Sequence, residues 1–187
     1  LSTGGTFRHL YDNLTQIRDR LVQVSDFTGF PEILGGRVKT LHPKIYGGLL
    51  WDDKFDCEGI KKIDIVIVNL YPFEEVIQND NSTEEDAIEN IDIGGVSLIR
   101  AAAKNFKNVK LAVDPDDYQV IIDSWILGYR EEVNRYLAVK GFDMVTKYDA
   151  CITNYFNKDI VFRRYEKQRS LKYGCNPYQD NSGVYTM

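Results

Sequence analysis

The segment IDIVIV at positions 63–68 constrains the fold of this chain more than any other part of the sequence. Its residues are β-branched and almost continuously apolar, which is typical of a strand buried on both faces in a parallel sheet. Pro72 ends the strand soon afterwards, because proline cannot donate to a ladder of backbone hydrogen bonds. The apolar stretch 109–113 predicts a second strand. Strands and helical patterns alternate up to about residue 115, so we expect an α/β fold, an open parallel sheet with helices on both faces.

The helices are predicted from apolar residues three and four positions apart. A capping box at 82–85 opens one of them, and Gly141 is expected to interrupt another. We predict helices over 6–20, 84–90, 96–106, from 114–117 onward and over 130–157, and a short strand at 22–24.

A chain of 187 residues suits one ordinary domain, or one domain and part of a next. The composition changes near residue 159, where basic residues gather. We therefore expect a first domain over 1–158, and over 159–187 a linker and the start of a second domain with a short strand at 184–185. The opening Leu1-Ser2-Thr3 reads as the end of a strand, so we expect that most of an N-terminal strand is missing and that the chain is a fragment.

Charge and cysteine usage exclude several classes of function. A net charge of −5 without a basic run is not that of a nucleic-acid-binding domain, although local cations could hold a small anionic ligand. Cys57, Cys151 and Cys175 form no close pair and no metal-ligand spacing, which predicts reduced cytosolic thiols and no metal site. No apolar run reaches the roughly 18 residues that a membrane span needs.

The motif Thr3-Gly4-Gly5-Thr6 offers backbone amides and two hydroxyls at the start of a helix, which would suit a phosphate. An ordinary glycine-containing turn is the other interpretation, because short glycine motifs are weak signals. The motif follows the end of one strand, and Asn69 follows the end of another. Ligands of open parallel sheets bind beyond the carboxyl ends of the strands, so we expect both segments at that edge.

The stretch GGRVKTLHP at 35–43 places two cations, a hydroxyl and an imidazole behind a Gly-Gly hinge. Arg37, Lys39 and Thr40 could hold a phosphosugar or polarise a carbonyl, or they could form a solvated basic loop. His42 could act as an acid or base, but a structural histidine that fixes the loop is the interpretation we favour.

Asp92 lies between two apolar residues just before a helix, and Lys104 lies near the end of that helix. Asp92 could be a partly buried base, or an anion that stabilises the helix start, and Lys104 could equally be a cation favoured at the helix end. The two lie about 18 Å apart along a straight helix, so they share a pocket only if the helix starts late or bends, or if the side chains reach. Tyr71 could donate to an oxyanion or simply pack.

Five segments together resemble one enzyme family closely: LSTGGT, TGFPEILGGRVKTLHP, VNLYPFEEVI, IENIDIGGVSLIRAAAKN and LKYGCNPYQ. The family is that of the bifunctional AICAR transformylase (AICAR formyltransferase)/IMP cyclohydrolases of purine biosynthesis. The resemblance implies a methylglyoxal-synthase-like fold and closure of 5-formamidoimidazole-4-carboxamide ribotide (FAICAR) to inosine monophosphate (IMP) with loss of water. It also implies a cytosolic homodimer that acts on a small-molecule nucleotide without a cofactor for this step. The transformylase centre, which uses 10-formyltetrahydrofolate, is expected beyond residue 187.

The resemblance implies roles for four residues. Lys39 matches the lysine that stabilises the transition state, Lys104 the proton donor and acceptor, Asp92 its carboxylate partner, and Tyr71 the tyrosine beside the formyl oxygen. Lys172 departs from the family, which commonly has arginine there; lysine keeps the charge but loses the bidentate fork. The resemblance implies substrate contacts at Thr3, Gly4, Gly5, Thr6, Arg37, Val38, Thr40, Val68, Asn69, Ile93, Lys172 and Tyr173.

Two other functions occur on the same fold. A non-catalytic regulatory module that senses a nucleotide or phosphosugar would use the same sheet edge without chemistry. The joint presence of the four catalytic candidates favours the enzyme over this alternative. A methylglyoxal synthase would leave the segments GGRVKTLHP and LKYGCNPYQ unexplained.

Overall fold

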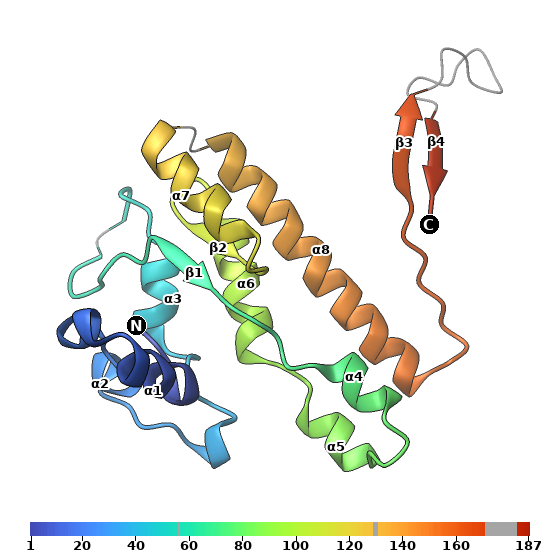
Figure 1. Ribbon diagram of the computed structural model, residues 1–187, viewed down its shortest axis with the longest axis horizontal. Coiled ribbons are helices and arrows are strands. Elements are labelled where there is room, and N and C mark those ends of the chain that lie inside the picture. The colour runs from blue at the N-terminus through green and yellow to red at the C-terminus, as the bar shows by residue number, and fades with distance from the viewer. Residues whose placement is uncertain (56, 129–130, 171–182) are drawn as a thin grey trace. The chain divides into compact units, whose positions relative to one another are not determined.

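The computed structural model describes residues 1–55, 57–128, 131–170 and 183–187 (Figure 1). The chain divides into two compact units, 1–148 and 149–187, and each is described by itself. The division falls within the long helix α8, Glu131–Phe156. The domain boundary expected at 158/159 remains a prediction.

The first unit is built on two parallel strands, β1 (Ile65–Ile67) and β2 (Lys110–Ala112), with Val66 opposite Leu111. The backbone N–H of Val68 donates to the carbonyl oxygen of Ala112 at 3.1 Å and extends the pairing by one residue. The structure thus confirms both predicted strands and their parallel direction. Because the strands are parallel, the segments that leave their carboxyl ends start from one edge of the sheet.

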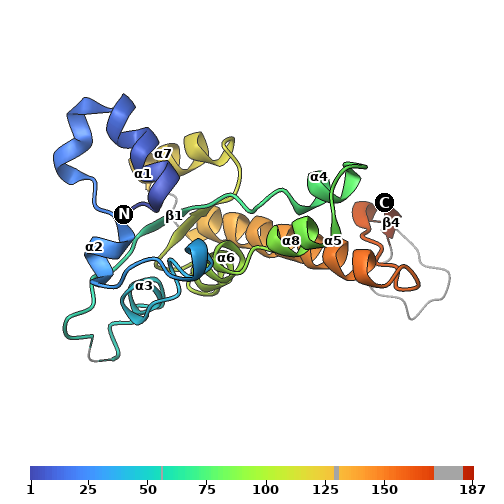
Figure 2. The same ribbon diagram turned by 90° about the horizontal axis from the view of Figure 1, so that it is seen from below.

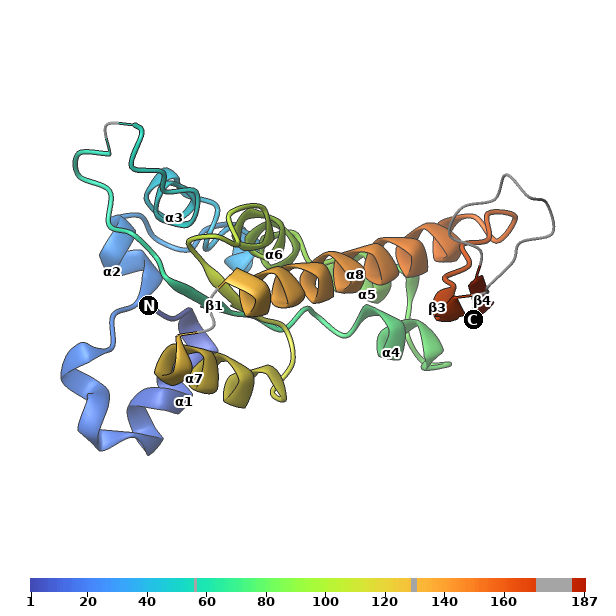
Figure 3. The same ribbon diagram turned by 90° about the horizontal axis from the view of Figure 1, so that it is seen from above.

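Helices lie on both faces of β2. Helix α6 (Gly94–Lys104) and helix α3 (Pro43–Leu49) lie on one side, and helix α7 (Asp117–Leu127) lies on the other (Figures 2 and 3). Successive strand residues point to opposite faces. Leu111 accordingly belongs to the large core cluster with α6, and Ala112 to a smaller cluster with Ile121 of α7. The predicted α/β fold is confirmed.

Burial of β1 differs from the prediction. The strand was expected to be buried on both faces, but only Val66 is buried, at 8% exposure, whereas Ile65 and Ile67 are 37% and 61% exposed. The cause is one-sided cover: α3 and α6 pack against the Val66 face, and the side chains that alternate with Val66 remain in contact with solvent. A continuous apolar run alone does not reveal this difference.

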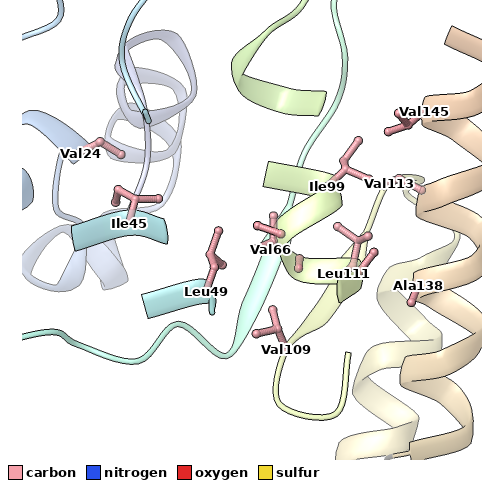
Figure 4. Packing of buried hydrophobic residues seen from close by; sticks show 13 residues of the cluster. Val24, Ile45, Leu49, Val66, Ile99, Val109, Leu111, Val113, Ala138 and Val145 are labelled. Carbon is pink, nitrogen blue, oxygen red and sulfur yellow. The ribbon is translucent and has the colours of Figure 1, made fainter. Parts of the chain in front are cut away.

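The large core joins side chains from strands and helices that are far apart in the sequence (Figure 4). Ile99 of α6 and Leu49 of α3 are both fully buried. Burial of each such aliphatic side chain contributes about 1.5–3 kcal/mol. The labelled members of the cluster are Val24, Ile45, Leu49, Val66, Ile99, Val109, Leu111, Val113, Ala138 and Val145.

Helix α8 runs without interruption through Gly141, contrary to the predicted break. The glycine serves close packing instead. A Cβ at this position would lie 2.4 Å from Leu111 Cδ2 and 3.1 Å from Ile99 Cγ2. Helix and strand therefore approach each other more closely than any larger residue would allow.

The N-terminal segments are more broken than predicted. The helix expected over 6–20 is α1 (Gly4–Asn13) followed by a 3-10 helix (Thr15–Arg20), because Leu14 leaves helical geometry at φ −119° and ψ 76°. The strand expected at 22–24 is a single parallel bridge between Ser2 and Gln23, after which α2 (Val24–Thr28) begins.

Two short helices follow β1: α4 (Phe73–Gln78) and α5 (Glu84–Glu89). The capping box of α5 is formed by Thr83 and Asp86, one residue later than predicted. The Thr83 hydroxyl accepts from the Asp86 N–H at 3.1 Å, and the Thr83 N–H donates to Asp86 Oδ2 at 2.9 Å. The bond from the Thr83 N–H, and a second from the Thr83 hydroxyl to Asp86 Oδ2 at 2.8 Å, lower the pKa of the Asp86 carboxyl below its ordinary value.

The second unit contains an antiparallel pair, β3 (Glu166–Ser170) and β4 (Gly183–Thr186). The predicted strand at 184–185 is confirmed. The charged sequence EKQRS of β3 carries no apolar alternation, so its strand was not predicted. Within the described ranges, no helix is long and apolar enough to cross a membrane.

The close packing at Gly141 can be tested by Gly141→Ala. We expect a loss of about 1–3 kcal/mol in the free energy of unfolding, because the added methyl group must displace the buried Leu111 and Ile99 side chains. Gly5→Ala in α1 is the matched control, since nothing lies within 4 Å of its added Cβ, and it should be neutral or slightly stabilising. Equal stability of the two variants in urea denaturation would contradict the packing account.

Candidate active site

Asp92 joins the loop after β1 to the first turn of α6. Its carboxylate accepts hydrogen bonds from the Gly95 N–H to Oδ1 at 2.6 Å and from the Tyr71 N–H to Oδ2 at 3.2 Å. Asp92 therefore stabilises the start of α6, which agrees with its interpretation as an anion at a helix start. Its charge lies beside Gly94 and Gly95, the first two residues of the helix. Each oxygen accepts one N–H and retains further acceptor capacity for a ligand.

A tyrosine of α8 fixes the backbone on either side of this carboxylate. The Tyr148 hydroxyl accepts from the Asp92 N–H at 2.9 Å and donates to the Asn90 carbonyl oxygen at 2.9 Å. The sequence analysis missed Tyr148. Its signal was present in the spacing of Gly141, Val145 and Tyr148, which places the three on one face of a helix.

Thr40 comes close to the same helix start. Its Oγ1 atom lies 3.1 Å from the position that a Cβ on Gly94 would occupy. Thr40 therefore shares the N-terminus of α6 with Asp92 and Ile93, and the amides of that first turn carry partial positive charge. Ile93 is exposed and half-buried Thr40 directly follows Lys39.

Lys39 folds back over the glycine hinge. A Cβ on Gly36 would lie 2.7 Å from Lys39 Cε and 3.2 Å from its Nζ, so the end of the lysine side chain lies directly over this glycine. Leu34, Gly35 and Gly36 all have positive φ angles of 54°, 65° and 90°. Positive φ strains Leu34, and such strain gathers at functional sites.

Glu32 is a second residue that the sequence analysis missed. Its carboxylate lies 3.6 Å from the position of a Cβ on Gly4 and 3.8 Å from that on Gly36. The glycines of the N-terminal motif and the hinge are thus brought to one place, with Lys39 beside them. A phosphate held there would be repelled by the Glu32 carboxylate and attracted by the Lys39 ammonium group. The lysine is therefore needed to offset the carboxylate.

The N-terminal motif begins α1. Thr3 precedes the helix in an extended conformation, and its hydroxyl does not cap the first turn. Gly4, Gly5 and Thr6 are the first residues of the helix. The amides of this turn point the way that the phosphate interpretation requires, and the binding role itself remains a prediction.

Arg37 pairs with Glu89 of α5. The guanidinium Nε donates to Glu89 Oε1 at 3.2 Å, and its Nη2 donates to Oε2. These hydrogen bonds and the arginine charge lower the pKa of the Glu89 carboxyl below its ordinary value of 4.5. Because the Glu89 pKa is lower in the folded state than in the unfolded state, the pair stabilises the fold fully above about pH 4.5. This stabilisation is lost as the pH falls through the lowered, folded-state pKa.

The remaining predicted residues occupy different surroundings. Tyr71 is 49% exposed, so it is not a core residue, and its role beside the substrate remains a prediction. Val68 and Val38 are half-buried, and Asn69 is exposed. Lys172 and Tyr173 lie outside the described residues, so their placement remains a prediction.

Lys104 is the last residue of α6 and is exposed. Asp92 precedes the same helix, so about 15 Å of helical rise separates the two within this chain. The helix neither starts late nor breaks between them. The position of Lys104 agrees with a cation at a helix C-terminus, and its catalytic role remains a prediction.

His42 has the structural role that we favoured. Its Nδ1 accepts from the Lys44 N–H at 3.1 Å and caps α3, whose first residue is Pro43. The described residues contain no group of three or more His, Cys, Asp or Glu side chains that could hold a metal ion.

Comparison with known proteins matches two family models, which meet near residue 100 and not at the boundary between the two compact units. Residues 1–97 match the family model of the MGS-like domain, and residues 102–187 match that of the AICARFT/IMPCHase bienzyme. The chain belongs to the AICARFT/IMPCHase bienzyme family. Its first half is the MGS-like part of that family.

Individual relatives of this bienzyme family agree. The bifunctional purine biosynthesis protein PurH of Thermoanaerobacter sp. (strain X514) is 49% identical over 196 residues, which are 96% of this chain and 38% of that protein. PurH of Staphylococcus saprophyticus is 46% identical over 99% of this chain and 37% of its own length. A crystal structure of ForH matches with a TM-score of 0.69 and 32% identity over 82% of each chain. The chain thus spans about 38% of the first curated relative, and biosynthetic relatives do not favour the regulatory alternative.

The Arg37–Glu89 pair predicts competition between Glu89 and an anionic ligand for Arg37. Glu89→Gln should tighten binding of inorganic phosphate by roughly two- to fivefold. In the wild-type chain Arg37 must give up its ion pair with Glu89 before it can bind the phosphate, and the substitution removes that cost. Glu85→Gln, on the same helix, is the control and should change nothing. Calorimetric titration measures both, and unchanged affinity in Glu89→Gln would exclude Arg37 from the site.

The anchoring role of Asp92 predicts a difference between two substitutions. Asp92→Ala should cost about 1–2 kcal/mol of unfolding free energy because it leaves the Gly95 and Tyr71 amides without their acceptor. Asp92→Asn should cost less than Asp92→Ala, since its single amide oxygen can still accept from one of the two N–H groups. Equal losses in urea denaturation would show that the charge, and not the hydrogen bonding, stabilises the helix start.

Proposed function

We propose that this chain carries the IMP cyclohydrolase activity of the bienzyme family, closing FAICAR to IMP with loss of water. The observation that carries the proposal is the Asp92 carboxylate, anchored at the N-terminus of α6 by the Tyr71 and Gly95 amides. Thr40 lies beside the same helix start, and Lys39, which directly precedes it, lies over Gly36 of the hinge. Open parallel sheets bind ligands at the carboxyl edge of their strands, and Tyr71 follows the carboxyl end of β1.

The reaction is a ring closure. The carboxamide nitrogen attacks the formyl carbon and a C–N bond forms. The formyl oxygen then leaves as water, with one proton from the carboxamide nitrogen and one from the formamido nitrogen, as the ring C=N bond forms. Both reacting groups belong to one substrate, so orientation within the site supplies much of the acceleration. The protein has to accept a proton at the amide and stabilise negative charge on the formyl oxygen.

The geometry suits a division of these roles. Asp92 accepts the amide proton, since both of its oxygens have spare acceptor capacity. Lys39 and the exposed hydroxyl of Tyr71 stabilise the oxygen, and Lys104 exchanges protons with solvent or product if the substrate reaches it. The nucleotide contacts belong to the segments around Thr3, Arg37, Thr40, Asn69 and Ile93.

The proposal extends to the longer protein of which the relatives are examples. There, Lys172 and Tyr173 would contribute to the neighbouring transformylase part, which would use 10-formyltetrahydrofolate as its formyl donor. The cyclohydrolase step would need no cofactor. We place the protein in the cytosol as a homodimer that acts on FAICAR and releases IMP.

Conversion of synthetic FAICAR to IMP, followed by ultraviolet absorbance, tests the proposal. Lys39→Ala should lower turnover by about 100-fold or more, because one group that stabilises the oxyanion is lost, while the melting temperature stays unchanged. Lys61→Ala removes an exposed lysine away from the site and serves as the matched control. Near-normal turnover in Lys39→Ala would contradict the role split, and no turnover in the folded wild-type chain would contradict the proposed function.

A further inference from the structure

Tyr148 of α8 contacts both of the segments that carry Asp92 and Tyr71. Residues 68–72 carry Tyr71 and lead from β1 into α4, and residues 90–93 carry Asp92 and lead from α5 into α6. The Tyr148 hydroxyl bonds to the second segment, and its ring packs against Phe73, which directly follows the first. A single side chain from a distant helix therefore links the two segments.

The Tyr148 hydroxyl is fully engaged with the backbone around Asp92. Its oxygen accepts from the Asp92 N–H, and its hydrogen is donated to the Asn90 carbonyl oxygen, each at 2.9 Å. A phenol carries only one hydrogen, so none is left to donate to a substrate. Any effect of this hydroxyl on the reaction must therefore pass through Asp92.

The Tyr148 ring contacts the other segment through Phe73. The two ring centroids lie 6.2 Å apart at an interplanar angle of 66°, and Phe73 is buried. This edge-to-face arrangement is one that aromatic pairs prefer. The Phe73 N–H donates to the Tyr71 carbonyl oxygen at 2.8 Å, and the Tyr71 N–H donates to the Asp92 carboxylate. The contacts of Tyr148 thus reach Asp92 along two routes.

These contacts bear on the position of the Asp92 carboxylate. The Tyr71 and Gly95 amides orient its two oxygens, whereas Tyr148 holds the backbone from which the side chain extends. A general base has to lie within hydrogen-bonding distance of the proton that it accepts. A misplacement of about 1 Å can lower the rate of a catalysed step by roughly 100-fold.

We propose that Tyr148 is a positioning residue for the ring closure, which holds the Asp92 backbone so that the carboxylate meets the carboxamide proton. The inference rests on the proposed function and deepens it, because it adds a residue of α8 to a site whose other members precede that helix. Substrate binding should depend little on Tyr148, since its hydroxyl has no hydrogen left for a ligand.

Steady-state kinetics of Tyr148→Phe with FAICAR test this role. The substitution removes both hydrogen bonds of the hydroxyl and keeps the ring beside Phe73. We expect kcat to fall by about 10- to 100-fold while KM stays within about twofold of the wild-type value. Rates are measured below the melting temperature of each variant, so that a loss of stability does not lower kcat. Tyr136→Phe, at an exposed position of the same helix, is the matched control and should change neither constant.

A double-mutant cycle with Asp92→Asn distinguishes positioning from general support of the fold. If Tyr148 acts through the Asp92 carboxylate, Tyr148→Phe should change kcat by less than about twofold in the Asp92→Asn background. A further loss as large as in the wild-type background would show that the hydroxyl acts elsewhere, and would overturn the inference.

The outcomes separate this inference from the proposed function. Turnover by the wild-type chain with an unchanged kcat in Tyr148→Phe would overturn the positioning role, even if the variant melts at a lower temperature, and would leave the proposed function standing. A raised KM with an unchanged kcat would also overturn it, because the hydroxyl would then serve binding. No turnover by the folded wild-type chain would overturn both proposals together.

Discussion

The hydrogen bonds from Tyr71 and Gly95 to Asp92 tie the end of β1 to the beginning of α6. Without this carboxylate, two backbone amides at the sheet edge would lose their acceptor, and the loop and helix would no longer be held together there. Tyr148 secures the same point from α8 by binding the Asp92 N–H and the Asn90 carbonyl group. One charged side chain therefore organises the edge at which Thr40 and Tyr71 also lie.

The rest of the first unit supports this edge through packing. Leu111, Ile99 and Gly141 fit together so closely that strand, helix α6 and helix α8 have almost no freedom to shift. A rigid core of this kind fixes where α6 begins, and thus where Asp92 sits. The glycine hinge is different: it carries strain at Leu34 and holds Lys39 by close contact with Gly36. The site thus combines a rigid carboxylate with a lysine on a strained loop.

Several of these features could be predicted from the sequence. The apolar runs located both strands, the position of Asp92 between two apolar residues placed it just before a helix, and a structural role was the favoured interpretation of His42. The one-sided burial of β1, the continuity of α8 at Gly141 and the contacts of Glu32 and Tyr148 could not be predicted in this way. Each depends on which distant residue packs opposite, and a local pattern does not contain that information.

We propose that ligands of this chain bind at the carboxyl edge of the strands. A competing cavity lies at the opposite edge, where Lys62, Lys107, Lys110, Asn134 and Trp125 line a space of about 200 Å³. Titration of the ¹⁵N-labelled chain with IMP, followed by amide chemical shifts, distinguishes the two. We predict shifts centred on Tyr71, Gly94 and Gly95; shifts confined to Lys107, Asn108 and the Trp125 indole would contradict the account.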